Sequence, residues 1–143
     1  MPNRRPFDHI GAFNFLLEIE GVTQGAVLSV DGITARTDVV RFKDGSDTVV
    51  RQRPGRNHTD NIIVRRGYTN NDELFNWYDV VRDGRVERKS GSIIIAGDDA
   101  SEITRFNFFE ALPCRWSLLV FDGDDSTTLI EEIEIAVERI EKG

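Results

Sequence analysis

The side chains that most often perform chemistry in proteins are few in this chain and lie far apart. His9 and His58 are the two histidines, and Cys114 is the single cysteine. Neither histidine has a metal-ligand spacing to another histidine or to the cysteine, and no nucleophile motif accompanies them. A lone cysteine also excludes an intramolecular disulfide. We therefore expect no catalytic residue, no metal site and no cofactor, and we interpret His58 as a turn residue.

Two further patterns that could bind ions are incomplete. Asp122, Asp124 and Asp125 have the spacing of the first ligands of a calcium loop, but the distal bidentate glutamate and the flanking helices are missing. The glycines do not form a phosphate-binding turn between a strand and a helix. We interpret the three aspartates as the tip of an exposed hairpin, and we do not expect an enzyme.

Charge is distributed unevenly along a chain whose net charge is −7. Residues 41–90 carry 11 basic and 8 acidic side chains, whereas residues 91–143 carry 4 basic and 12 acidic ones. The segment VVRQRPGRNHTDNIIVRRG, residues 49–67, alone contains five arginines. Such an arrangement suits either a patch that binds a polyanion or two complementary surfaces that meet when copies associate. No aromatic residue alternates with the arginines to stack on bases, which favours protein as the partner.

Composition sets the class of protein that must position these charges. The chain has 143 residues, enough for one domain with one core. No apolar run approaches the ~20 residues of a membrane-spanning helix, so we expect no membrane insertion. No secretory signal is visible at the start of the sequence, so we expect synthesis in the cytoplasm.

Short runs of β-branched and aromatic residues, separated by Gly, Asp and Asn, predict a mainly β fold. Residues 13–19 alternate between apolar and polar positions, the pattern of a strand with one face on a core. The same reasoning places the other expected strands at 26–30, 39–43, 49–53, 61–65, 86–88, 92–95 and 105–109. The turn at 97–99 should join the last two of these strands as a hairpin.

One helix is expected, and one segment is ambiguous. Asn70 is a candidate N-cap with Glu73 three residues later, and Asp83-Gly84 should end the helix. Its apolar face, which we interpret as packed on the sheet rather than exposed to a partner, consists of Leu74, Trp77, Tyr78 and Val81. The C-terminal segment LIEEIEIAVERIEKG has both helical and strand spacing, and the pattern alone favours a helix.

The order of these motifs resembles the tail-tube protein family, which builds the inner tubes of contractile phage tails, R-type pyocins and phage-derived contractile injection systems. The resemblance runs from about residue 13 to residue 141. It is carried by FNFLLEIEGV, VRQRPGR, NIIVRRGYTNNDELFNWYDVVRDGRVERKSGSI, ITRFNFFEALPCRW and IEEIEIAVERIE. The chain departs from the family at SLLVFDGDDSTT, where such tubes usually have a Gly-Pro-Asp segment.

The resemblance implies a structural protein: a small antiparallel β-barrel or sandwich with one outer helix at about 70–82, assembled as hexameric rings. It also implies a strand at the C-terminus, against the helix that the pattern favours. Residues 1–12 would form an N-terminal arm and residues 43–60 an extended inter-subunit loop. The alternatives are a single-ring tail-completion or baseplate-proximal protein, or a β-barrel module that binds nucleic acid or another anion through the arginines of 51–66.

A ring of identical subunits needs two different complementary surfaces on each subunit. We expect the long loop, shaped by Pro54 and Gly55, to bring arginines to carboxylates of a neighbouring copy. The predicted interface residues are Arg51, Arg53, Pro54, Gly55, Arg56, Glu131, Glu132, Glu134 and Glu138. The outer face of the helix should meet the sheath through Asp72, Glu73, Asn76, Asp79 and Arg82.

The implied partners follow from the tube. They are other copies of the chain, the contractile sheath protein, baseplate or spike proteins and terminator proteins. DNA, tape-measure protein or effector cargo would pass through the bore without sequence-specific binding. A bore lined by alternate residues of 92–95, 105–109 or the C-terminal strand would be negative.

Overall fold

The computed structural model describes residues 14–143 except 21, 47, 70, 100 and 124–126, and the side chains of 22–24 are also outside the description. The expected N-terminal arm at 1–12 therefore lies outside the described residues. The elements in chain order are β1 (Asn14–Ile19), β2 (Val22–Val27), β3 (Ser29–Asp31), β4 (Ala35–Phe42), β5 (Arg51–Thr59), β6 (Ile62–Gly67), α1 (Glu73–Arg82), β7 (Lys89–Ala96), β8 (Glu102–Asp122), β9 (Thr127–Ala136) and β10 (Arg139–Lys142).

The main sheet closes on itself and forms a barrel. Its strands are antiparallel in the order β2-β1-β7-β8-β9-β6-β3, and only Leu28 separates β2 from β3. The Leu28 amide donates to the carbonyl of Arg65 in β6 at 2.7 Å. One bent segment therefore pairs with both ends of the sheet, which leaves no unpaired edge between them. The small antiparallel β-barrel or sandwich implied by the family resemblance is confirmed, and the structure has the barrel form.

The longest strand, β8, is shared between two halves of the barrel. Its first half pairs with β7 on one side and β10 on the other, and its second half pairs with β9. Glu110 lies at the junction with a φ of 55°, the only positive φ among the described residues other than glycine. The chain that pairs with β8 is interrupted at the same place, between β9 and β10, where the Glu138 amide donates to the Phe109 carbonyl at 3.1 Å. Both strands thus bend at the same place.

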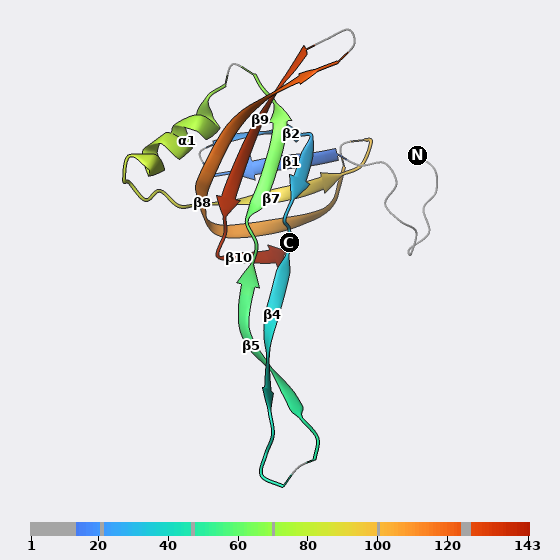
Figure 1. Ribbon diagram of the computed structural model, residues 1–143. Coiled ribbons are helices and arrows are strands. Elements are labelled where there is room, and N and C mark those ends of the chain that lie inside the picture. Colours follow the sequence, from blue (N-terminus) through green and yellow to red (C-terminus); the bar gives the residue numbers. More distant parts are fainter. Residues whose placement is uncertain (1–13, 21, 47, 70, 100, 124–126) are drawn as a thin grey trace.

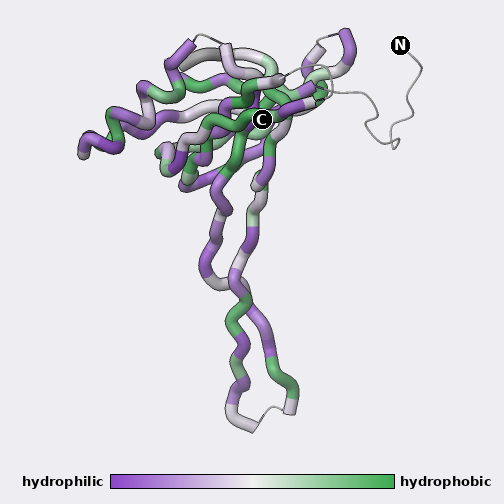
Figure 2. Tube along the Cα trace, turned by 45° about the horizontal axis from the view of Figure 1, so that its top comes forward, coloured by the Kyte–Doolittle hydropathy of each residue, from purple (hydrophilic) through white to green (hydrophobic). Residues whose placement is uncertain are grey.

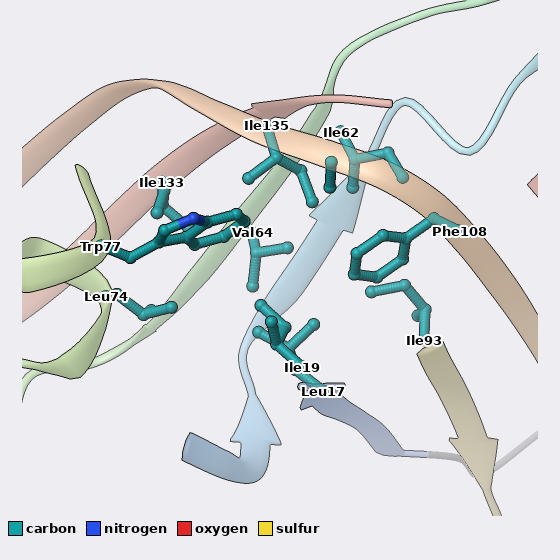
Figure 3. Packing of buried hydrophobic residues seen from close by; sticks show 11 residues of the cluster. Leu17, Ile19, Ile62, Val64, Leu74, Trp77, Ile93, Phe108, Ile133 and Ile135 are labelled. Carbon is teal, nitrogen blue, oxygen red and sulfur yellow. The ribbon is translucent and has the colours of Figure 1, made fainter. Parts of the chain in front are cut away.

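The core fills the barrel and extends beneath the helix (Figure 3). Leu17, Ile93 and Phe108 are each 1% exposed, as are Ile62 and Val64 on the other side. Leu74 and Trp77 of α1 join the same cluster and Val81 packs against it, which confirms these positions of the expected inward face, whereas Tyr78 is half-buried. The Trp77 indole N–H donates to the Glu87 carbonyl at 2.8 Å, so the polar edge of this buried ring is satisfied.

Glycine is required where strands and turns approach closely. A Cβ on Gly91 would lie 2.3 Å from the Glu18 carbonyl oxygen and 2.6 Å from the Phe108 ring. Gly32 has a φ of 92°, and its Cβ would lie 2.1 Å from the Asn61 carbonyl oxygen. The Asp31-Gly32 turn that follows β3 therefore depends on glycine for both conformation and space.

Three local predictions differ from the structure. The C-terminal segment forms β9 and β10, so the helix favoured by its pattern was wrong and the strand implied by the family resemblance is confirmed. The helix begins at Glu73 with Asp72 as its N-cap residue, later than about 70, and the expected cap Asn70 lies outside the described residues. Residues 86–88 are not a strand, because β7 begins at Lys89.

Among the described residues, no helix has the length and apolar character needed to cross a membrane.

Candidate subunit interface

Strands β4 and β5 leave the barrel together as a long two-stranded arm, defined here as residues 35–59 (Figure 1). They form a separate two-stranded sheet with its own register, from Ala35 opposite Thr59 to Phe42 opposite Arg51. Most arm side chains are exposed, including Val39 at 55% and Val50 at 56%. Figure 2 shows apolar and polar residues alternating along the arm, outside the core. A projecting surface of this kind is typical of a docking element.

Polar contacts hold the root of the arm to the barrel. The Thr59 hydroxyl donates to the Val137 carbonyl at 2.7 Å, and Arg36 lies 3.4 Å from Asp60. Between the two strands, the Thr37 hydroxyl donates to Asn57 at 2.9 Å, and the ring of His58 lies 2.7 Å from the Asp38 carboxylate. His58 therefore lies on a strand and braces the arm, which corrects its interpretation as a turn residue.

Pro54 and Gly55 lie inside β5 and not at a loop apex. They face a register shift between Thr37 and Val39 of β4, which is a bulge. Proline cannot donate to the ladder, and a Cβ on Gly55 would lie 3.0 Å from the Val40 side chain, so both residues suit this irregular position. The tip of the arm is at 43–50 instead. The expected loop 43–60 is thus the tip together with one strand of the arm.

One face of the arm combines apolar and basic side chains. Val40 pairs with Arg53 and Phe42 pairs with Arg51, and paired residues two positions apart share a face. The Arg53 guanidinium lies over the Phe42 ring, 5.6 Å from its centroid. Among the described residues, no carboxylate lies within ion-pair distance of Arg53 or Arg56. We call Val40, Phe42, Arg51 and Arg53 the arginine face of the arm.

The carboxylates predicted to receive these arginines have partners within their own subunit. Glu131 is 1% exposed and accepts hydrogen bonds from Arg66 and from the Trp116 indole, both at 2.8 Å. Glu132 is 4% exposed and accepts a bond of 2.5 Å from Arg65 and a further bond from Arg115. Both carboxylates are thus neutralised inside the subunit.

The other two predicted carboxylates are more accessible. Glu134 accepts from the Asn61 amide at 2.8 Å and lies 3.4 Å from Arg115, while the exposed Glu138 lies 3.4 Å from Arg88. The five arginines of 49–67 therefore divide into two groups. Arg65 and Arg66 belong to the barrel, where hydrogen bonds to Asp31 and Glu132 raise the pKa of Arg65. The other three belong to the arm.

The chain that forms this barrel, helix and arm matches the profile of a known protein family over nearly its whole sequence. The profile of the T4-like virus tail tube protein gp19 family matches residues 11–141. This chain belongs to that family. It is a structural subunit of a tail tube, as the sequence resemblance implied, and it is a component of a virion tail or contractile particle.

Solved structures of tube proteins share the fold. The chain is 22% identical to a subunit of the sheath–tube complex of the PVC extracellular contractile injection system, with 96% of this chain and 93% of that chain covered and a TM-score of 0.82. The chain is also 22% identical to a subunit of the PVC sheath/tube terminator structure. That match covers 97% of this chain and 99% of the other, with a TM-score of 0.81. Hcp1 from Flavobacterium johnsoniae is 25% identical to the chain. That match covers 91% of this chain and 94% of Hcp1, with a TM-score of 0.60. Among curated protein sequences, no relative matches the chain.

The exposed face of α1 in this tail tube protein is polar, as expected. Asp72, Glu73, Asn76 and Arg82 are exposed, and Asp79 is half-buried. Asp79 pairs with Arg82, and Asp72 accepts a hydrogen bond of 2.9 Å from the Tyr68 hydroxyl, which raises the tyrosine pKa. Contact of this face with a sheath stays a prediction.

Sequence reasoning missed a second apolar surface, at the far end of the β8–β9 hairpin. Leu118 is 42% exposed and Val120 is 61% exposed, and Asp122 follows on the same face. Leu129 lies opposite Val120 on β9. The available signal was the run of apolar residues before Asp122, in the stretch where the sequence departs from the family. We call Leu118, Val120, Asp122 and Leu129 the acidic hairpin face.

Among the described residues, no three His, Cys, Asp or Glu side chains form a group that could hold a metal ion.

Proposed function

We propose that six copies of this tail tube protein close into a ring and that the rings stack into a hollow tube. The observation that carries the proposal is the family match over 11–141 on a closed barrel with one long arm. A closed barrel has no free sheet edge in its body, so lateral growth by strand addition is restricted to β10 and the arm. The arm therefore supplies a directional contact, which a head-to-tail assembly requires.

In this proposal the arm binds a neighbouring copy of the protein. Arg53 and Arg56 extend from the barrel without an intramolecular carboxylate among the described residues, so a neighbouring copy supplies their counter-charges. Glu138 is the most exposed of the four predicted carboxylates, with a side-chain exposure of 62%, and it lies beside the root of the arm. It is the one best placed for contact between copies, whereas Glu131 and Glu132 stabilise the subunit itself.

The face that we assign to the bore is the outward side of β1, β7, β8 and β10. A polar row crosses these four strands in register: Glu18 lies opposite Ser92, Ser92 opposite Asn107, and Asn107 opposite Glu141. The Ser92 hydroxyl donates to Asn107 at 2.5 Å. Repeated around a ring, the row would give a polar lining with two carboxylates per copy. Such a lining lets DNA or acidic cargo pass without adhering.

The remaining partners belong to the same proposal. The polar face of α1 contacts the sheath, and baseplate or spike proteins and terminator proteins contact the two ends of the tube. The subunit is made in the cytoplasm, and the bore carries DNA, tape-measure protein or effector cargo. A sheath must release the tube surface as it contracts, and exposed charged pairs suit such a contact because each contributes little, ~0–1 kcal/mol.

Negative-stain electron microscopy of the purified protein across a concentration series, paired with mass by light scattering, tests the assembly. Six-fold rings and hollow filaments with a uniform bore are the expected result. A monomeric mass and no rings at any concentration would contradict the proposal.

One alternative is a protein that forms a single ring at the end of a tube. It is favoured by the similarity to the terminator structure, whose TM-score is almost the same as that of the sheath–tube structure. The same negative-stain micrographs distinguish a terminator from a tube subunit. A terminator stops at one ring, whereas a tube subunit yields filaments that lengthen with concentration.

The other alternative, a module that binds nucleic acid through the arginines of 51–66, has less support. Arg65 and Arg66 are engaged by carboxylates of the barrel, so the five arginines do not form one surface. Steeply salt-dependent binding of a labelled oligonucleotide by the monomer would favour this function instead.

A further inference from the structure

The described residues contain two exposed surfaces that mix apolar and charged side chains, and they lie at opposite ends of the molecule. The arm extends from one end of the barrel and the β8–β9 hairpin from the other (Figure 1). Resting on the proposed tube, we propose that the arginine face of the arm docks onto the acidic hairpin face of a copy in the adjacent ring. This contact names the partner surface for the arm.

Charge complementarity supports the pairing. Residues 35–59 carry six basic and three acidic side chains, a net charge of +3, whereas residues 117–128 carry no basic residue and three aspartates, of which Asp122 lies within the described residues. Among the described residues of its own subunit, Arg53 has no carboxylate partner, and the Asp122 carboxylate accepts a hydrogen bond from the Thr127 hydroxyl at 3.0 Å. Docking supplies each charge with its counter-charge at a desolvated contact.

Apolar complementarity supports the same pairing. Val40 is 37% exposed on the arginine face, while Leu118 and Val120 are 42% and 61% exposed on the acidic hairpin face. In both surfaces the named apolar residues share one side of a two-stranded ribbon, with the charge beside them, while Val39 and Phe121, 55% and 53% exposed, lie on the opposite sides. Two such ribbons can lay their apolar sides together and keep the charges in contact at the margin.

The geometry explains why the contact yields a stack and not a closed dimer. A donor surface at one end and a receptor surface at the other form a heterologous interface, which repeats without closing. The nine residues of β5 span ~30 Å, so the arm can reach past its own barrel to the next one. Rings joined in this way are connected through each of their arms.

Charge-reversal variants test the electrostatic half of the contact. Arg53→Glu should raise the protein concentration needed for filaments by about tenfold or more, because two like charges then meet. Asp122→Arg should restore assembly when combined with Arg53→Glu. The matched control is Arg41→Glu, which makes the same charge change on the opposite face of the arm and should assemble normally. Equal defects in Arg41→Glu and Arg53→Glu, or no rescue by Asp122→Arg, would overturn the proposal.

Cross-linking tests the location. In a Cys114→Ser background, one preparation carries Val40→Cys and another carries Val120→Cys, and the two are mixed before assembly. A short bis-maleimide linker should give covalent dimers several times more often than in a control mixture of Val40→Cys with Val86→Cys, a residue 70% exposed and outside both faces. Filaments without this cross-link would overturn the docking while leaving the tube intact. No rings or filaments from the Cys114→Ser parent would overturn the tube and the docking together.

Discussion

At the scale of single residues, the charges of this tail tube protein fall into two classes with different roles. Those of the barrel are paired in register across neighbouring strands, as between Arg66 and Glu131. Those of the arm are more exposed: Arg36 and His58 have carboxylate partners near its root, whereas Arg53 and Arg56 have none among the described residues. The sequence analysis assigned Glu131 and Glu132 to arginines of a neighbouring copy, whereas both carboxylates have arginine partners within their own subunit. That distinction depends on strand register, which a single sequence does not specify.

The buried Glu131 should be critical for folding of the subunit. Glu131→Gln leaves the guanidinium of Arg66 buried without its counter-charge, so we expect a loss of about 3–5 kcal/mol in the free energy of unfolding. Urea denaturation below the assembly concentration measures it. Glu141→Gln is the control, because its pair with Arg139 is exposed and should contribute less than about 1 kcal/mol. Equal stability of both variants would contradict the assigned role.

The single thiol should react slowly at neutral pH. Burial raises the pKa of Cys114, and the nearby Glu134 carboxylate raises it further. Because the thiolate is the reactive form, the alkylation rate should rise at higher pH than in an unstructured peptide containing cysteine. Glu134→Gln should move the profile only part of the way back, since burial is the larger cause. A profile identical to that of the peptide would contradict this.

At the scale of elements, the mainly β character and the packing of the single helix were predictable from the sequence, whereas the C-terminal segment was not. The inward positions of β9 include Glu131 together with Ile133 and Ile135. A buried carboxylate in the apolar row disrupts the alternation that identifies a strand, and the remaining isoleucines then fit helical spacing as well. The expected loop 43–60 covers the tip and β5 but omits β4, and the bulge at Pro54-Gly55 was taken for part of a loop because this is a common turn pair.

The turn after β3 should depend on the absence of a side chain at Gly32. Gly32→Ala combines an unfavourable φ with a clash against the Asn61 carbonyl. Strain in φ alone costs ~1–3 kcal/mol, and we expect the free energy of unfolding, measured by urea denaturation, to fall by more than this. Gly84→Ala separates the two effects, because Gly84 has a φ of 96° but no atom within 4 Å of the added Cβ. Comparable losses in both variants would remove the steric argument.

At the scale of the whole molecule, each side of the barrel is assigned a different contact. The arm and the acidic hairpin face lie at the two ends of the molecule (Figure 1). The polar row of β1, β7, β8 and β10 lies on one side, and α1 packs against the barrel wall. A stacked ring needs contacts at both ends, a bore and an outer surface. The polar face of the helix was evident from its sequence. The two ends were not, because they depend on where the barrel closes.

The outer face of α1 should affect the sheath and not the tube. Glu73→Lys combined with Asn76→Lys replaces two exposed side chains, and Glu73 is an acidic residue of the first helical turn, so we expect subunit stability to fall by about 0.3–1 kcal/mol and filaments to form normally. Binding of the sheath protein, measured by co-sedimentation with preformed tubes, should fall. Asp98→Lys, at the exposed turn after β7, is the control for a charge change elsewhere. Undiminished sheath binding would exclude this face as the contact.

The arm has a kinetic consequence that follows from its having no core of its own. A two-stranded ribbon is marginally stable in water, so part of the docking free energy is consumed in ordering the arm. Two free copies that meet must order an arm for a single contact. A copy that arrives at an existing ring is held through several surfaces at once. In the proposed assembly, growth from a ring already in place should therefore outpace spontaneous initiation, and we expect tubes to begin where a first ring is supplied.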